Sequence, residues 1–101
     1  ERIPELINFA KTNCQKLKIK NIEFHRTTGV NGWPDNAPYE RILVSATSDK
    51  IHQVLIDQLA ENGCLVIPIR DSVFVVKKDS KGNVVKVEHV GFVFVPLIDD
   101  K

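Results

Sequence analysis

Residues 37–68 constrain the fold of this chain more than any other stretch. They read APYERILVSATSDKIHQVLIDQLAENGCLVIP: a turn, an apolar strand, an amphipathic segment, a glycine and a second apolar strand. Continuous apolar runs predict buried strands at residues 41–46 and 65–69. Two such strands joined by a helix form a βαβ unit of a parallel sheet, which places functional sites at the carboxyl ends of the strands.

The segment between these strands is predicted to be a helix. Ser48 or Asp49 would cap its first turn by accepting free backbone N–H groups. Gly63 would end it in the left-handed conformation. Its apolar face would consist of Ile51, Val54, Leu55 and Leu59.

An earlier helix is predicted to begin at Pro4, because proline suits the first helical turn. Its apolar positions recur at helical spacing and are Leu6, Ile7, Ala10, Cys14 and Leu17. Apolar and polar residues then alternate at 22–25, which predicts a short strand. Residues 26–38 are rich in turn formers, so we expect a loop there.

The carboxyl-terminal third is β-rich. Residues 73–77 and 84–95 read as strands, joined by a hairpin loop at 79–83. An antiparallel pair of this kind commonly completes a parallel sheet. The predicted fold class is therefore α/β, with parallel strands followed by an antiparallel carboxyl-terminal hairpin.

Composition narrows the class of protein. A chain of 101 residues is one domain or a piece of one. Its 14 basic and 13 acidic residues give a net charge of +1, so we expect no nucleic-acid partner and no membrane partner. No apolar run reaches the roughly 18 residues of a membrane helix, which favours a soluble, cytoplasmic protein. Because the chain starts at Glu1 and enters a helix at once, we expect it to be a fragment of a longer protein.

No residue pattern predicts a metal site or a nucleophile. His25, His52 and His89 lack metal-binding spacing, so we expect no metal. Cys14 and Cys64 lie far apart, which is typical of two free, buried thiols in a reducing compartment. The serines after the first buried strand lack a GxSxG elbow, and the glycines of the 26–38 loop lack phosphate-loop spacing.

Five segments, in order and spacing, resemble the protein-L-isoaspartate O-methyltransferase family. They are ERIPEL at 1–6, GVNGWP at 29–34, APYERILVSA at 37–46, LIDQLAENGCLVIPI at 55–69 and GFVFVPLI at 91–98. The resemblance implies that residues 1–101 are the carboxyl-terminal part of a Rossmann-like methyltransferase domain. It also implies S-adenosylmethionine as cofactor and methyl transfer to the carboxylate of L-isoaspartyl residues in damaged proteins, a step of protein repair. The implied partner is an isoaspartyl-containing protein or peptide.

The resemblance assigns cofactor-binding roles to three residues. Glu1 lies where the family has the acidic residue that binds the ribose hydroxyls, since a carboxylate can accept two hydrogen bonds from a diol. Thr28 and Gly29 lie where the family has an Asp-Gly pair on the adenine side. In this chain Thr27 and Thr28 replace the family's Gly and Asp, so the charge that would strengthen a hydrogen bond to adenine is lost.

The terminal strand and the turn after it border the substrate peptide in the family. The matching residues are Val95, Pro96 and Leu97. The family's glycine-rich cofactor loop and catalytic serine lie upstream of Glu1, so no catalytic residue is expected in this chain, and the chain alone should be inactive.

Two alternatives stay open at this point. One is a catalytically inactive, methyltransferase-like module that binds a partner, which the changed Thr27-Thr28 pair mildly favours. The other is a methyltransferase for a different acceptor. In either case the family fold places two further strands between residues 22–25 and 41–46, so we expect exposed sheet edges that cause self-association or marginal stability.

Overall fold

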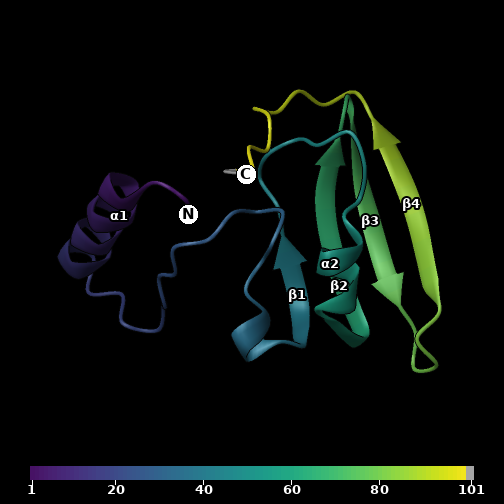
Figure 1. Cartoon of the computed structure of the whole chain (residues 1–101), viewed down its shortest axis with the longest axis horizontal. Coiled ribbons are helices and arrows are strands. Elements are labelled where there is room, and N and C mark those ends of the chain that lie inside the picture. Colours follow the sequence, from purple (N-terminus) through teal and green to yellow (C-terminus); the bar gives the residue numbers. More distant parts are fainter. Residues whose placement is uncertain (100–101) are drawn as a thin grey trace.

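The computed structural model describes residues 1–99, in which a mixed four-stranded sheet carries most of the regular structure (Figure 1). The elements are α1 (Pro4–Lys16), a 3₁₀ helix (Pro34–Asn36), β1 (Tyr39–Leu43), α2 (Gln53–Asp57), β2 (Leu59–Ile69), β3 (Ser72–Lys78) and β4 (Val84–Val90). The strands lie in the sheet in their chain order, β1-β2-β3-β4.

The strand pairing confirms the predicted α/β architecture. β1 runs parallel to β2, with Ile42 opposite Leu65, and α2 lies between the two strands in sequence. β2 pairs antiparallel with β3, and β3 pairs antiparallel with β4. The βαβ unit and the carboxyl-terminal hairpin are therefore both present.

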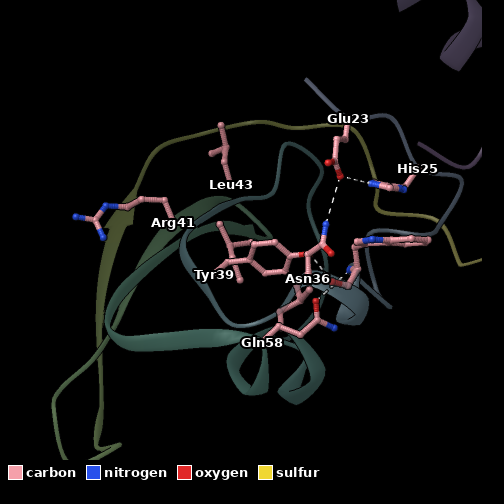
Figure 2. Close-up of a pocket in the computed structure, with 11 residues that line it drawn as sticks. Glu23, His25, Asn36, Tyr39, Arg41, Leu43 and Gln58 are labelled. Carbon is pink, nitrogen blue, oxygen red and sulfur yellow. Dashed lines mark hydrogen bonds and ion pairs between the residues drawn. The ribbon is translucent and has the colours of Figure 1, made fainter. Parts of the chain in front are cut away.

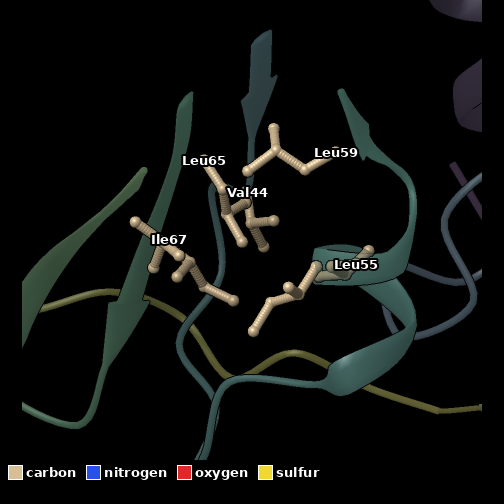
Figure 3. Close-up of a cluster of buried hydrophobic side chains, with 7 residues drawn as sticks. Val44, Leu55, Leu59, Leu65 and Ile67 are labelled. Atoms are coloured by element: carbon tan, nitrogen blue, oxygen red, sulfur yellow. The ribbon is translucent and has the colours of Figure 1, made fainter. Parts of the chain in front are cut away.

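The core lies between α2 and one face of the sheet, as Figure 3 shows. Alternate residues of β2 point to this face, because successive strand residues face opposite sides. Leu65 and Ile67 are fully buried there, and Val76 of β3 lies beside Leu65. The buried cluster consists of Val44, Leu55, Ile56, Leu59, Leu65, Ile67 and Val76.

Helix α1 stands apart from the sheet (Figure 1). Pro4 occupies its first turn as predicted, and Lys16 in its last turn suits the negative end of the helix dipole. Only Ile7 of this helix is buried, whereas Phe9 is largely exposed. The predicted helix is thus present, but most of its predicted apolar face is exposed. Within residues 1–99, no helix is long and apolar enough to cross a bilayer.

Both strands predicted before α2 differ from the structure. Residues 22–25 are not in a strand, because no strand of the described chain lies beside them to pair with. The strand predicted at 41–46 begins earlier and ends at Leu43, although the N–H of Val44 still donates to the carbonyl of Val66 at 2.9 Å. β1 is therefore short, and it is an edge strand because β2 is its one neighbour among the described strands.

The helix between the parallel strands is shorter than predicted. Neither Ser48 nor Asp49 caps it, since α2 begins five residues after Ser48, and the Ser48 hydroxyl instead hydrogen-bonds to Nε2 of His52 at 2.9 Å. Gly63 does not end the helix, because it already lies within β2. α2 ends instead at Asp57, where the C-cap Gln58 is right-handed with a φ of −84°, and the left-handed Asn62, with a φ of 61°, lies inside β2.

The last predicted strand also ends early. β4 stops at Val90, and Gly91 takes a φ of 99°, which turns the chain away from the sheet. The N–H groups of Gly91 and Phe92 both donate to the carbonyl of Asp71, each at 2.9 Å. Residues 91–95 are therefore not a continuation of the strand, and the segment returns across the end of the sheet toward β1 (Figure 1).

Candidate functional site

An open cavity of about 620 Å³ lies at the carboxyl end of β1. Its walls come from residues 1–6, from the 27–32 loop, from residues 42–46 and from residues 95–98. This is the place where α/β sheets with parallel strands bind ligands. All six residues that the sequence assigned to a site line it: Glu1, Thr28, Gly29, Val95, Pro96 and Leu97.

Backbone amides fix the carboxylate of Glu1. Its Oε1 accepts the N–H of Arg2 at 2.9 Å and the N–H of Ile3 at 3.0 Å. The hydrogen bond from Ile3, helped by that from Arg2, lowers the pKa of Glu1 below its ordinary value, because both donors stabilise the ionised form. In the part of the chain that the structure describes, Oε2 has no hydrogen-bond partner. One oxygen of an ionised carboxylate is thus left to accept hydrogen bonds.

The residues around Thr28 form a tight turn. Its carbonyl accepts the N–H of Asn31 at 3.2 Å and that of Gly32 at 3.1 Å, and its hydroxyl accepts the same Asn31 N–H at 3.3 Å. The hydroxyl of Thr27 donates to the carbonyl of Gly32 at 2.7 Å. Thr28 is only 7% exposed. Both hydroxyls therefore serve the turn, while the exposed Gly29 offers its backbone to the cavity.

The predicted cofactor side and the predicted substrate side touch each other. A Cβ on Gly29 would lie 2.5 Å from Cδ1 of Leu97, so a larger residue could enter only if Leu97 moved. Leu97 N–H donates to the carbonyl of Thr47 at 2.6 Å, and Thr47 N–H donates to that of Val95 at 2.7 Å. Pro96 lies between Val95 and Leu97 in the sequence and forms an isolated parallel β-bridge with Thr47. The two groups of residues therefore form one continuous wall, fastened to the chain just after β1.

Gln58 does not line this cavity but anchors the loop that forms one of its walls, a role that sequence reasoning missed. Its side chain is 6% exposed, donates to the carbonyl of Asn31 at 2.8 Å and accepts the N–H of Trp33 at 3.0 Å. The backbone carbonyl of Gln58 accepts the N–H of Tyr39 at 2.7 Å. Gln58 thus fixes the 27–33 loop to the start of β1 (Figure 2). The one available signal was an uncharged polar residue in the segment LIDQL, between Asp57 and Leu59.

A smaller cavity of about 380 Å³ lies between this loop and the edge of β1 (Figure 2). The ring of His25 stacks on Trp33 with centroids 4.1 Å apart. Oε2 of Glu23 hydrogen-bonds to Nε2 of His25 at 3.0 Å and accepts Nδ2 of Asn36 at 3.3 Å. These groups are partners of one another, so we read the cluster as packing that stiffens the loop.

The other side chains considered from the sequence form no further site. Cys14 and Cys64 are free and half-buried. His52 bonds to Ser48, and His89 is exposed on β4. Over residues 1–99, no three His, Cys, Asp or Glu side chains gather closely enough to hold a metal ion.

Comparison with known proteins identifies the family. Residues 1–101 match the family described as protein-L-isoaspartate(D-aspartate) O-methyltransferase. The chain belongs to this family. A member named protein-L-isoaspartate O-methyltransferase, from Methanococcoides burtonii, is 40% identical over 101 aligned residues, which cover 97% of this chain and 50% of the relative. The chain thus spans about half the length of that relative.

Solved structures of the family have the same fold. A putative protein-L-isoaspartate O-methyltransferase from Plasmodium falciparum, in complex with S-adenosyl-L-homocysteine, superposes with a TM-score of 0.81 at 26% identity, over 97% of this chain and 50% of that one. A second structure, named protein-L-isoaspartate O-methyltransferase, gives a TM-score of 0.86 at 26% identity, over 99% of this chain and 33% of that one. The sheet described above is therefore part of the methyltransferase fold.

Proposed function

We propose that this chain is the carboxyl-terminal part of an S-adenosylmethionine-dependent methyltransferase that acts on L-isoaspartyl residues of damaged proteins. One observation carries the proposal: a single cavity at the end of a parallel strand gathers the residues on its cofactor side and its substrate side. The chain's match to half of a relative's length supports a partial domain spanning residues 1–101. A cytoplasmic location fits its two free cysteines, since reducing compartments keep thiols unpaired.

The residues that line the cavity fit S-adenosylmethionine. A volume of about 620 Å³ lies within the range of small-molecule sites. The open oxygen of the Glu1 carboxylate can accept hydrogen bonds from ribose hydroxyls, and Gly29 presents exposed backbone to the same cavity. When bound, the cofactor supplies a methyl group on a positively charged sulfur, which is the group that a carboxylate oxygen attacks.

On the substrate side, this chain supplies positioning. Thr47 holds residues 95–97 with two backbone hydrogen bonds, and Val95 is exposed at that rim. A peptide laid against the rim would bring its carboxylate toward the cofactor side of the same wall. Methyl transfer depends on aligning the two reactants, so a rigid rim contributes to the rate. We assign no catalytic residue to this chain.

The test compares the full-length protein with residues 1–101 alone. Calorimetry should detect S-adenosylmethionine binding to the full-length protein, which should methylate an isoaspartyl peptide and not the same peptide with aspartate. In the full-length protein, Glu1→Gln should weaken binding about tenfold or more, because a charge-assisted hydrogen bond is lost. Glu5→Gln, in the exposed first turn of α1, is the matched control. Residues 1–101 alone should transfer no methyl group. Absence of cofactor binding to the full-length protein would overturn the proposal.

A second candidate is a catalytically inactive binding module derived from the same fold. The internal hydrogen bonds of Thr27 and Thr28 favour it, since the Thr27 hydroxyl already donates to Gly32 and the Thr28 hydroxyl already accepts the N–H of Asn31. The same calorimetry separates the two candidates. A folded full-length protein that does not bind S-adenosylmethionine would be the binding module. One that binds it and methylates the peptide would be the enzyme.

A further inference from the structure

β4 is an edge strand with an unusually apolar surface. It pairs only with β3 among the described strands, and Figure 1 shows nothing beyond it. All seven of its residues are exposed, and four of them are valines, from 37% exposed at Val84 to 75% at Val90. A long, exposed edge strand rich in β-branched residues is a template for pairing with another strand.

Two hydrogen bonds at the ends of the hairpin show which way the β4 backbone points. Asp79 N–H donates to the carbonyl of Asn83 at 2.9 Å. Gly91 N–H donates to the carbonyl of Asp71, also at 2.9 Å. Bonded pairs of an antiparallel ladder recur at every second residue, so the odd-numbered residues of β4 bond to β3. The even-numbered residues direct their N–H and C=O groups outward, and they are Val84, Lys86, Glu88 and Val90.

We propose that β4 pairs antiparallel with β4 of a second copy of this chain, about a two-fold axis at Val87. In this register Lys86 lies opposite Glu88 of the second copy, and Val84 lies opposite Val90. All of these are outward-facing residues, so each opposed pair can exchange two backbone hydrogen bonds. The result is an isologous dimer with one continuous eight-stranded sheet, four strands from each copy.

Charge selects this register over its neighbours. The axis at Val87 forms two Lys86–Glu88 pairs, one on each side of the axis. A shift of the axis to Lys86 would place two lysines opposite each other, and a shift to Glu88 would do the same with two glutamates. Opposite charges across a strand pair stabilise it, whereas like charges destabilise it. The sequence VVKVEHV is thus self-complementary only about its central valine.

The side chains at this edge are already arranged for the pairing. The hydroxyl of the buried Ser72 donates a hydrogen bond to Oε1 of Glu88 at 2.9 Å. This bond fixes Glu88 on the α2 face of the sheet. Lys86 lies on the same face, because residues two apart in a strand share a face. On the opposite face, the half-exposed Val87 would pack against its own copy. Pairing would therefore remove apolar surface from water on one face, and on the other it would join the charges of Lys86 and Glu88 between flanking Val84–Val90 pairs.

The position of β4 keeps this interface away from the candidate site. The cavity lies at the end of β1, and β4 is at the opposite edge of the sheet. The dimer therefore leaves the cavity open. Its formation does not depend on the proposed methyltransferase function.

Sedimentation of the 11.4 kDa chain tests the interface. We expect a dimer at high concentration that dissociates on dilution. Lys86→Glu should weaken the dimer about tenfold or more, because two attractive pairs become repulsive. Adding Glu88→Lys in the same chain should restore it, since the opposed charges are again complementary. Lys81→Glu makes the same charge change in the hairpin loop and should have no effect.

Three outcomes would overturn the proposal. One is a monomer at every concentration. Another is an association that Lys86→Glu leaves unchanged in a variant with normal thermal unfolding. The third is an association that Leu43→Lys, at the other edge of the sheet, abolishes instead.

Discussion

Single side chains hold the candidate site and the hairpin loop in shape by bonding to backbone groups, either nearby or far away in the sequence. Gln58 links the end of α2 to the loop at residues 27–33, and Glu1 fastens itself to the start of α1. Asp79 does the same for the hairpin loop, where Oδ1 accepts the N–H groups of Lys81 and Asn83 at 2.8 and 2.9 Å. Each of these side chains supplies a hydrogen bond to backbone groups that would otherwise lack one.

Replacing Gln58 should destabilise the 27–33 loop. Gln58→Leu leaves the N–H of Trp33 and the carbonyl of Asn31 without their buried partner, which should cost about 1–3 kcal/mol of unfolding free energy. Urea unfolding gives the magnitude, and hydrogen exchange at Trp33 gives the location. Gln53→Leu is the control, because Gln53 is exposed and its side chain bonds, among the described residues, only to Asp57. Equal effects of the two substitutions would contradict this role.

Asp79 should make the hairpin sensitive to acid. The N–H of Asn83, followed by that of Lys81, lowers the pKa of Asp79 below its ordinary value of 3.8. A carboxyl whose pKa is lowered by folding adds stability above its unfolded pKa, and that stability is lost as the pH falls through the folded-state pKa. Asp79→Ala should therefore lower the melting temperature at neutral pH, and the difference should shrink as the pH falls below 3.8 and vanish in strong acid.

Thermal unfolding of both proteins across this pH range checks the Asp79 prediction. Asp49→Ala removes an exposed carboxylate outside the hairpin and should leave the melting temperature nearly unchanged. A difference between wild type and Asp79→Ala that persisted in strong acid would show that the carboxylate charge is not the cause.

At the scale of elements, β2 is the most important strand, because it lies between β1 and β3 and carries the centre of the core. Leu65→Ala should cost about 2–5 kcal/mol, since Leu65 is 0% exposed and its loss leaves a cavity against α2. Val54→Ala, on the exposed side of α2, should stay within about 0.5 kcal/mol. Denaturant titration measures both values. Similar costs would mean that α2 does not cover the core.

Short-range sequence patterns correctly predicted the strands that pair with a strand close by in the sequence. Residues 65–69 and 73–77 read as strands and are strands, because each pairs with the next stretch of chain. Residues 22–25 have the alternation of a strand, but a strand also needs a neighbour. Gly63 read as a helix stop because the pattern alone cannot show that β2 already begins at Leu59.

The candidate site was predicted only as far as family resemblance reached. The resemblance supplied Glu1, Thr28 and Gly29, and the cavity brings these three together. It did not supply Gln58, whose side-chain hydrogen bonds reach residues 25 and 27 positions away in the sequence. No periodicity encodes a contact of that range, so only the folded structure could reveal it.

At the scale of the whole molecule, α1 and the sheet behave as two parts joined by an extended segment. No regular element links them between Lys16 and Pro34. Trypsin should therefore cut first at Lys18 or Lys20 and leave the sheet intact as a resistant product, because backbone outside regular structure opens easily. Mass spectrometry of a digestion time course would identify the first cuts. Cleavage at Lys77 within β3 at an equal rate would contradict this division.

The order of the strands has a consequence for how the chain acquires its structure in time. β2 pairs antiparallel with β3, and β3 with β4, each across a short turn, whereas β1 pairs parallel with β2 across the longer segment that contains α2. Contacts between nearby residues form faster than contacts that close long loops. The β2-β3-β4 meander can thus form early, and β1 adds to it afterwards. The walls of the cavity, drawn from residues 1–6, 27–32 and 95–98, come together last. A nascent chain would complete its sheet before it could hold a ligand.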